Sequence, residues 1–137
     1  MAESPSKGVV REFYARYPDL GAAVELFADG FVLHGPGGSV STADDFQQTE
    51  SVLIAAVPDA RITVEEQIAE GEKVATRWSW RGTFQNSWMG LEPTGADIAF
   101  TAVVIDRVVD GRIEERWVEA DVFGLMSKLG AIPPMQG

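Results

Sequence analysis

The stretch Asp110–Gly130, DGRIEERWVEADVFGLMSKLG, predicts a turn, a strand and a closing helix in succession. Asp110-Gly111 is a strong signal for a two-residue hairpin loop, because a type I′ turn needs positive φ at both central positions. The β-branched run 98–109 precedes this turn, and a second strand-like run, 112–122, follows it. The stretch therefore predicts a β-hairpin that leads directly into a C-terminal helix over 122–129.

The turn also sets an expected register for the hairpin. If Asp110 and Gly111 are its central residues, Val104 lies opposite Trp117 and Phe100 lies opposite Asp121. Side chains two apart share a face, so one face would carry Phe100, Ala102, Val104, Asp106, Glu115, Trp117, Glu119 and Asp121. So many acids beside aromatic groups suit neither a core face nor a solvent face. Either the face lines a half-wet cavity, or a β-bulge turns part of the strand over.

Asp121 has two interpretations. At the end of the strand it would sit at a cavity, where burial beside aromatic groups raises a carboxyl pKa toward a range useful for proton transfer. Directly before the 122–129 helix it would instead be an N-cap, a common position for Asp. Spacing alone favours the cap.

The remainder of the chain predicts helices first and then a meander of long strands. Helices are expected over 9–17, over 20–27 and from an N-cap at Ser41 to about residue 57, and strands over 31–34, 61–70 and 73–83. Segment 84–95 reads as a mobile loop that carries Trp88 and Met89. This order predicts a single α+β domain over residues 1–137, with helices on one face of an antiparallel sheet.

Composition excludes several classes of function. The net charge of −10 argues against nucleic-acid binding and against an anionic membrane surface. The absence of cysteine and the single histidine, His34, leave no expected metal site, and no cofactor is expected. No run is long and apolar enough for a signal core or a membrane span, so the cytoplasm is the expected location. The sequence has no serine in a nucleophile-elbow motif and no glycine-rich phosphate-binding loop. Acid–base catalysis by a carboxylate is therefore the chemistry that the residues still allow.

Four motifs in order resemble the SnoaL-like polyketide cyclases of the NTF2-like superfamily. They are Phe31–Gly37 (FVLHGPG), Arg77-Trp78 with Arg81-Gly82-Thr83, Pro93-Thr94-Gly95, and Glu115, Trp117 and Asp121 followed by Gly124-Leu125-Met126 and Leu129-Gly130. The resemblance covers nearly the whole chain. It implies a cone, in which a curved antiparallel sheet wraps around the N-terminal helices, and a homodimer formed through the outer face of the sheet.

For function, the resemblance implies intramolecular aldol closure of an aromatic polyketide ring, with Asp121 as acid/base. His34 would orient a substrate carbonyl or hydrogen-bond a carboxylate. The pocket for this hydrophobic, polycyclic substrate would be walled by Tyr14, Trp78, Trp80, Trp88, Met89, Phe100 and Trp117, although each Trp is alternatively a core residue. Asp106 and Glu115 are the alternative acids. Arg116 departs from the family, because many members have His there.

A fold does not determine a reaction. A hydroxylase, isomerase or hydrolase that tailors polyketides is an alternative on the same fold. A dimeric ligand-binding module with no catalytic activity is another.

Overall fold

The computed structural model describes residues 4–132, which form four α-helices, two short 3-10 turns and one six-stranded sheet. The helices are α1 (Pro5–Arg16), α2 (Leu20–Ala23), α3 (Ala43–Ala56) and α4 (Val122–Leu129), and the 3-10 turns are η1 (Val24–Leu26) and η2 (Pro36–Gly38). The strands are β1 (Phe27–His34), β2 (Val40–Ser41), β3 (Arg61–Glu70), β4 (Lys73–Thr83), β5 (Asp97–Val109) and β6 (Arg112–Ala120).

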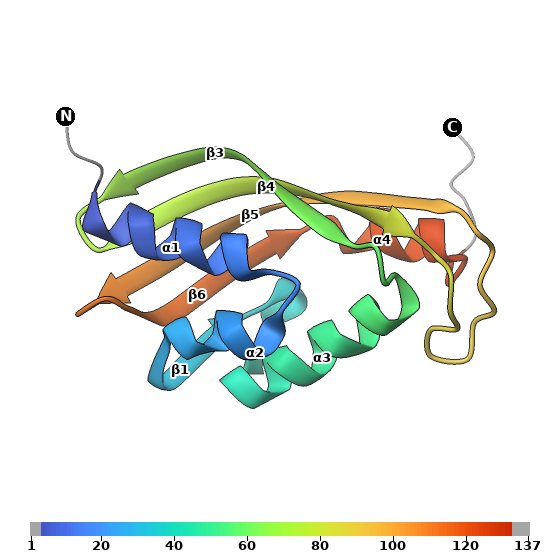
Figure 1. The fold of residues 1–137 in the computed structure, drawn as a ribbon, viewed down its shortest axis with the longest axis horizontal. Coiled ribbons are helices and arrows are strands. Elements are labelled where there is room, and N and C mark those ends of the chain that lie inside the picture. Colours follow the sequence, from blue (N-terminus) through green and yellow to red (C-terminus); the bar gives the residue numbers. More distant parts are fainter. Residues whose placement is uncertain (1–3, 133–137) are drawn as a thin grey trace.

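The strand order is β2-β1-β6-β5-β4-β3. Each neighbouring pair is antiparallel except β1 and β6, which run parallel, so the expected purely antiparallel sheet is corrected to a mixed one. The sheet arches over α1, α2 and α3, while α4 packs against β5 (Figure 1). The predicted α+β architecture, with a curved sheet around the N-terminal helices, is confirmed.

Local signals explain where the later helices begin and end. The α4 helix spans the predicted residues, 122–129. Its N-cap is Asp121, whose side chain accepts a hydrogen bond from the Gly124 N–H, and its C-cap is Gly130 with φ 85°. The N-cap of α3 is Thr42 rather than the predicted Ser41, because Thr42 and Asp45 form a reciprocal capping box.

The hairpin turn is as predicted, but the register beyond it is not. Asp110 and Gly111 have φ of 51° and 76°, as a type I′ turn requires. Val108 pairs with Ile113 and Arg107 pairs with Glu115, so one residue of β6 is left over at the start of the strand. From this bulge onward the expected register is wrong by one: Val104 faces Val118, and Ile105 faces Trp117.

The bulge exchanges the two faces of β6. Arg116 is buried beneath the sheet, where the sequence-based register had placed Trp117. Trp117 and Glu119 move to the outer face, away from Phe100, Ala102 and Val104. The mixed face is therefore resolved by the bulge, which was one of the two interpretations open from the sequence.

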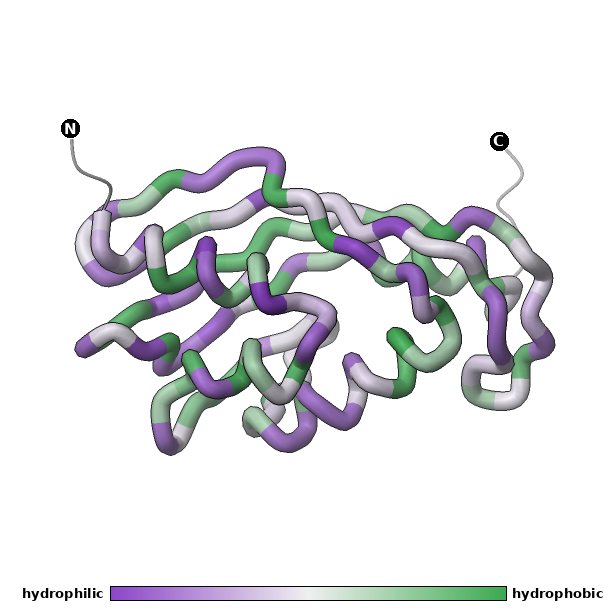
Figure 2. Tube along the Cα trace, viewed as in Figure 1, coloured by the Kyte–Doolittle hydropathy of each residue, from purple (hydrophilic) through white to green (hydrophobic). Residues whose placement is uncertain are grey.

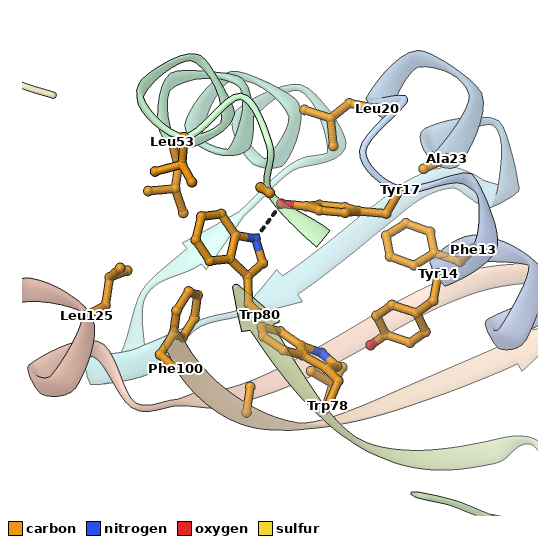
Figure 3. Packing of buried hydrophobic residues seen from close by; sticks show 14 of the residues in the cluster. Phe13, Tyr14, Tyr17, Leu20, Ala23, Leu53, Trp78, Trp80, Phe100 and Leu125 are labelled. Atoms are coloured by element: carbon orange, nitrogen blue, oxygen red, sulfur yellow. Dashed lines mark hydrogen bonds between the residues drawn. The ribbon is translucent and has the colours of Figure 1, made fainter. Parts of the chain in front are cut away.

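On β4 and β5 the alternation of side chains follows the sequence. Val74, Thr76, Trp78 and Trp80 of β4 are buried on the inner face, as are the even-numbered residues 98–108 of β5. A second irregularity, between Val64 and Glu66 of β3, turns Ile68 outward, where its relative exposure is 65%. The inner face therefore carries a continuous aromatic and aliphatic core, and part of it can be seen in Figure 3.

The α3 helix changes character along its length. Its first half is hydrophilic and its second half is hydrophobic, as the colouring in Figure 2 shows. Glu50 lies at this boundary, one helical turn from both Phe46 and Leu53, which pack into the core. A carboxylate on the apolar stripe of a helix therefore faces the interior.

Candidate active-site cavity

A cavity of about 680 Å³ lies between the inner face of the sheet and helices α1, α3 and α4. Its volume lies within the range of small-molecule sites. Most of its wall is apolar, with Phe46 and Leu53 from α3, Phe100 from β5 and Leu125 from α4 among the lining residues. Among the polar groups at the wall are Tyr14 from α1, Tyr17 directly after α1, Glu50 from α3 and Arg116 from β6. An apolar cavity with a few convergent polar groups is the arrangement expected of a binding or catalytic site.

Arg116 is anchored by a buried ion pair. Its Nε lies 2.7 Å from Asp106 Oδ1 and its Nη2 lies 3.2 Å from Asp106 Oδ2, across the β5–β6 ladder. Burial alone would lower the pKa of Arg116, but the charges of Asp106 and Glu50 and the Tyr14 hydroxyl outweigh burial and raise it, so the guanidinium stays protonated. Burial raises the pKa of Asp106, and the charge of Arg116 opposes this rise. The two hydrogen bonds that Asp106 accepts from the N–H groups of Arg116 favour the ionised carboxylate.

Aromatic rings complete the setting of Arg116. The guanidinium carbon lies 4.2 Å from the ring centroid of Phe13 and 5.5 Å from that of Tyr14. These contacts hold the guanidinium plane at the cavity wall, where its charge acts through apolar surroundings. Arg116 therefore presents a fixed positive charge at the cavity wall rather than a proton donor of tunable pKa.

Glu50 is the carboxyl group that the cavity perturbs most clearly. Burial raises its pKa to about 6, and both the Arg116 charge and a hydrogen bond with Tyr17 oppose this shift. A carboxyl that titrates near neutrality can both take up and release a proton during turnover. Glu50 is not among the site residues predicted from the sequence, although its spacing from Phe46 and Leu53 on the apolar side of α3 was a usable signal.

The structure places most of the predicted pocket side chains at the cavity. Tyr14, Trp78, Trp88, Met89 and Phe100 line it, whereas Trp80 is buried behind the wall and bonded to Tyr17. Trp117 lies on the outer face because of the bulge and does not line this cavity, which corrects its assignment. Whether the lining residues bind substrate stays a prediction.

Trp88 and Met89 reach the cavity from a tight turn. Trp88 and Leu91 exchange backbone hydrogen bonds of 3.0 and 2.8 Å, and Met89 and Gly90 between them both have positive φ. Met89 remains 77% exposed at the rim. The segment predicted to be a loop therefore forms a small hairpin at the cavity.

His34 belongs to an outer cluster. Its Nε2 lies 2.6 Å from Glu115 Oε2, and its ring stacks on Trp117 at 5.4 Å between centroids. The His34 hydrogen bond, together with Arg107, lowers the pKa of Glu115. His34 therefore bonds a carboxylate, one of the two roles that the sequence suggested, but it does not line the cavity.

Asp121 is exposed and its side chain caps α4, with Oδ1 2.9 Å from the Gly124 nitrogen. It does not line the cavity either. Its assignment as the acid/base stays a prediction, and its position favours the capping role. Asp106, the alternative acid, is fully buried against Arg116 behind the cavity wall.

Within residues 4–132 no three His, Cys, Asp or Glu side chains come close enough to hold a metal ion. In the same part of the chain no helix is long and apolar enough to cross a membrane.

The comparisons with known proteins agree with this fold. The family model for the SnoaL-like polyketide cyclases matches residues 8–129. The chain therefore belongs to the SnoaL-like polyketide cyclase family, and the resemblance inferred from the motifs is confirmed. No protein of curated function matches the chain in sequence.

Solved structures with similar folds come from several bacteria. AclR, a proposed hydroxylase from Streptomyces galilaeus, is 25% identical with a TM-score of 0.87, over 96% of this chain and 84% of that one. IdmH, a proposed polyketide cyclase from Streptomyces antibioticus, is 31% identical with a TM-score of 0.81, over 93% of this chain and 99% of that one. A SnoaL-like protein from Jannaschia sp. CCS1 is 17% identical with a TM-score of 0.82, over 97% of this chain and 99% of that one, which shows the fold alone.

Proposed function

We propose that the protein is an enzyme that transfers protons on a hydrophobic carbonyl substrate, with ring closure of a polyketide by intramolecular aldol addition as its reaction. The observation that carries the proposal is Glu50, a carboxyl whose burial raises its pKa to about 6 in the wall of an apolar cavity of about 680 Å³. Family membership and the likeness to IdmH support the choice of a polyketide substrate.

The proposed reaction needs one group that first accepts a proton and then returns it. The Glu50 carboxylate removes a proton from a carbon next to a carbonyl, which leaves an enolate. The enolate carbon attacks a second carbonyl of the same molecule, so that one carbon–carbon bond forms and the second oxygen becomes an alkoxide. Glu50 then gives its proton to that alkoxide. Protons and electrons balance without a cofactor.

The surrounding side chains suit both halves of this cycle. Apolar walls exclude water, so that the carboxylate is a stronger base than in solution. The buried charge of Arg116 lies near enough to Glu50 to lower its pKa, and it also stabilises negative charge on substrate oxygen. Tyr17, which accepts a hydrogen bond from Trp80, lies beside Glu50 and lowers the pKa of the carboxyl group.

An aromatic methyl ketone tests the proton transfer without knowledge of the natural substrate. The protein should accelerate exchange of the methyl protons of 2-acetylnaphthalene with deuterated solvent. Glu50→Gln keeps the size of the side chain but cannot take up a proton, so the accelerated exchange should fall by roughly a hundredfold to ten-thousandfold.

Asp121→Asn is the matched comparison. If Asp121 is the base, exchange is lost in Asp121→Asn and kept in Glu50→Gln, which would overturn the assignment to Glu50. If neither the wild type nor any variant accelerates exchange of a ketone that binds, the proposed proton transfer is wrong, and a ligand-binding module remains.

A second candidate reaction, hydroxylation in the same cavity, is favoured by the likeness to AclR over 96% of the chain. It would insert one atom of molecular oxygen into an aromatic polyketide and would need an external two-electron reductant to convert the other atom to water, whereas aldol closure leaves the elemental composition unchanged. Mass spectrometry of the product of a bound polyketide separates the two reactions.

We also propose that two copies associate through the outer face of the sheet. Ile68 of β3 and Val103 and Ile105 of β5 are large apolar residues on that face, with relative exposures of 65%, 46% and 39%. Exposed aliphatic side chains on the face opposite the cavity favour burial against a second copy.

A further inference from the structure

Two tryptophan–tyrosine pairs lie side by side in the core, and only one of them is complete. Trp78 and Trp80 are two apart on the inner face of β4, and Tyr14 lies on α1 three residues before Tyr17, the C-cap of that helix. The two tyrosines therefore follow β4, with Tyr17 beside Trp80 and Tyr14 beside Trp78 (Figure 3). The same two side-chain types meet twice, but their hydrogen bonding differs.

In the complete pair every polar group has a partner. The indole N–H of Trp80 donates to the Tyr17 hydroxyl at 2.7 Å. Tyr17 in turn lies close enough to Glu50 to lower the pKa of that carboxyl group, so the indole, the phenol and the carboxyl group form a chain of polar contacts. The indole N–H of this pair is therefore not available to a ligand.

In the other pair, neither the Trp78 indole N–H nor the Tyr14 hydroxyl proton has an acceptor among the described residues. Trp78 is 8% exposed, and its Nε1 has no hydrogen-bond partner within residues 4–132. The indole lies near enough to the Tyr14 hydroxyl to lower the pKa of that group, but its N–H does not reach the oxygen with hydrogen-bond geometry. Burial of an N–H donor without an acceptor costs free energy, so the position favours any ligand that brings an acceptor.

Tyr14 is also arranged as a donor. Its oxygen accepts a hydrogen bond from Arg116 Nη2 at 3.4 Å, so its own O–H proton is left to donate elsewhere. Burial raises the pKa of Tyr14 far above neutrality, which keeps the hydroxyl protonated. Tyr14, Trp78 and Arg116 all line the cavity.

We propose that Trp78 Nε1–H and Tyr14 O–H together form a receptor for one ligand oxygen, a carbonyl oxygen that becomes an enolate oxygen during reaction. Arg116, held by Asp106, lies behind the receptor and stabilises the negative charge that develops there. The inference rests on the proposed proton transfer and deepens it: the substrate presents an oxygen to the β4–α1 wall while its acidic carbon faces Glu50 on α3. The substrate class is therefore an aromatic or polycyclic ketone, not a hydrocarbon.

Paired ligands test the receptor without turnover. 2-Acetylnaphthalene carries the oxygen, and 2-ethylnaphthalene has nearly the same shape without it. The wild type should favour the ketone more strongly than the octanol–water partition of the two ligands predicts, and each of Trp78→Phe and Tyr14→Phe should lower the ketone-to-hydrocarbon affinity ratio roughly threefold to tenfold. Phe100→Leu is the matched control, because it removes apolar wall and should weaken both ligands alike, leaving the ratio unchanged.

The indole N–H resonance of Trp78 gives a direct readout in the folded protein. The chain has four tryptophans, so four indole N–H peaks are expected, and the peak missing from Trp78→Phe identifies the group. The ketone should move this peak downfield as the N–H gains an acceptor, and the hydrocarbon should not. The Trp80 peak should not show this shift, since its N–H is already bonded to Tyr17.

These results separate the receptor from the proposed function. A ketone that binds with no effect on the Trp78 peak, or with an affinity ratio that Trp78→Phe and Tyr14→Phe do not change, overturns the receptor even if Glu50→Gln abolishes proton exchange. A downfield shift and a lowered ratio without any exchange activity uphold the receptor and overturn only the proposed function.

Discussion

Arg116 and Asp106 face each other on adjacent strands β6 and β5, joined by two hydrogen bonds of 2.7 and 3.2 Å in a fully buried setting. Arg116 lines the largely apolar cavity, and Asp106 is buried behind the cavity wall. Neither charge has bulk water to solvate it, so each depends on the other. This dependence makes the pair costly to break from one side and cheaper to replace as a whole.

The single variants Asp106→Leu and Arg116→Met should each lower the free energy of unfolding by about 3–5 kcal/mol, because each leaves an uncompensated buried charge. The double variant should be more stable than either single one, since it buries no charge. Urea unfolding of all four proteins measures the coupling. Losses that simply add in the double variant would contradict the ion pair.

Exchange of ketone protons should depend on pH through Glu50. The active form is the carboxylate, and the pKa of Glu50 is raised to about 6. The rate per folded molecule should therefore rise as pH increases through about 6 and level off above it. Rates measured from pH 4.5 to 8 and corrected for solvent-catalysed exchange check this, and a profile without that limb would exclude Glu50 as the base.

Glu50 should also make stability depend on pH, in the opposite direction to a salt-bridged carboxylate. Its folded-state pKa of about 6 lies above the unfolded value of 4.5, so its contribution is fully present below pH 4.5 and is lost as pH rises through about 6. Glu50→Gln removes this dependence. Relative to the wild type, the variant should gain on the order of 1–2 kcal/mol between pH 4.5 and 8. Urea unfolding at both pH values measures the difference, and a constant difference would contradict burial of the charge.

The position of Asp121 predicts a structural effect only. Asp121→Ala removes the acceptor for the Gly124 N–H and should lower the free energy of unfolding by about 1 kcal/mol. Asp121→Asn keeps a capping acceptor and should change stability little. Thermal melts combined with the exchange assay check both variants. Loss of exchange in a fully folded Asp121→Asn protein would restore Asp121 as the acid/base.

The proposed dimer predicts a response to charge on the outer face. Val103→Glu with Ile105→Lys places charges on two exposed positions of β5 and should convert the dimer to a monomer, as measured by light scattering at micromolar concentration. Val40→Glu is the matched control, because Val40 is also exposed, at 67%, but lies on β2 at the opposite edge of the sheet. A wild type that is monomeric at this concentration would end the proposal.

Local signals made much of this fold predictable. The Asp110-Gly111 turn, the faces of β4 and the bounds of α4 each depend on residues within a few positions of one another. The β6 register was not predictable in this way, because the bulge at Glu114–Glu115 is settled across strands. Arg107 donates to both of these carboxylates, at 3.0 and 3.2 Å, and burying Arg116 against Asp106 requires the extra residue.

The candidate site was predictable only in part, for a similar reason. Tyr14, Trp78 and Phe100 could be assigned to the cavity because large aromatic residues on inward faces have few other positions. Glu50 was missed because a single acid near a helix middle reads as solvated unless the apolar stripe around it is traced. Its raised pKa arises from burial of the carboxyl group against residues distant in sequence, which no local pattern contains.

The bulge in β6 determines which face of the sheet each following residue of the strand occupies. Side chains after Glu115 alternate between the inner and the outer face of the sheet. The one added residue decides whether Arg116 or Trp117 points toward the cavity. An insertion or deletion of a single residue ahead of this point would exchange the entire lining of the strand, with no substitution at all. In related proteins, a one-residue gap in this short stretch would alter the cavity lining more than most single substitutions. A sequence alignment shifted by one position here would match inward-facing residues of one protein with outward-facing residues of another.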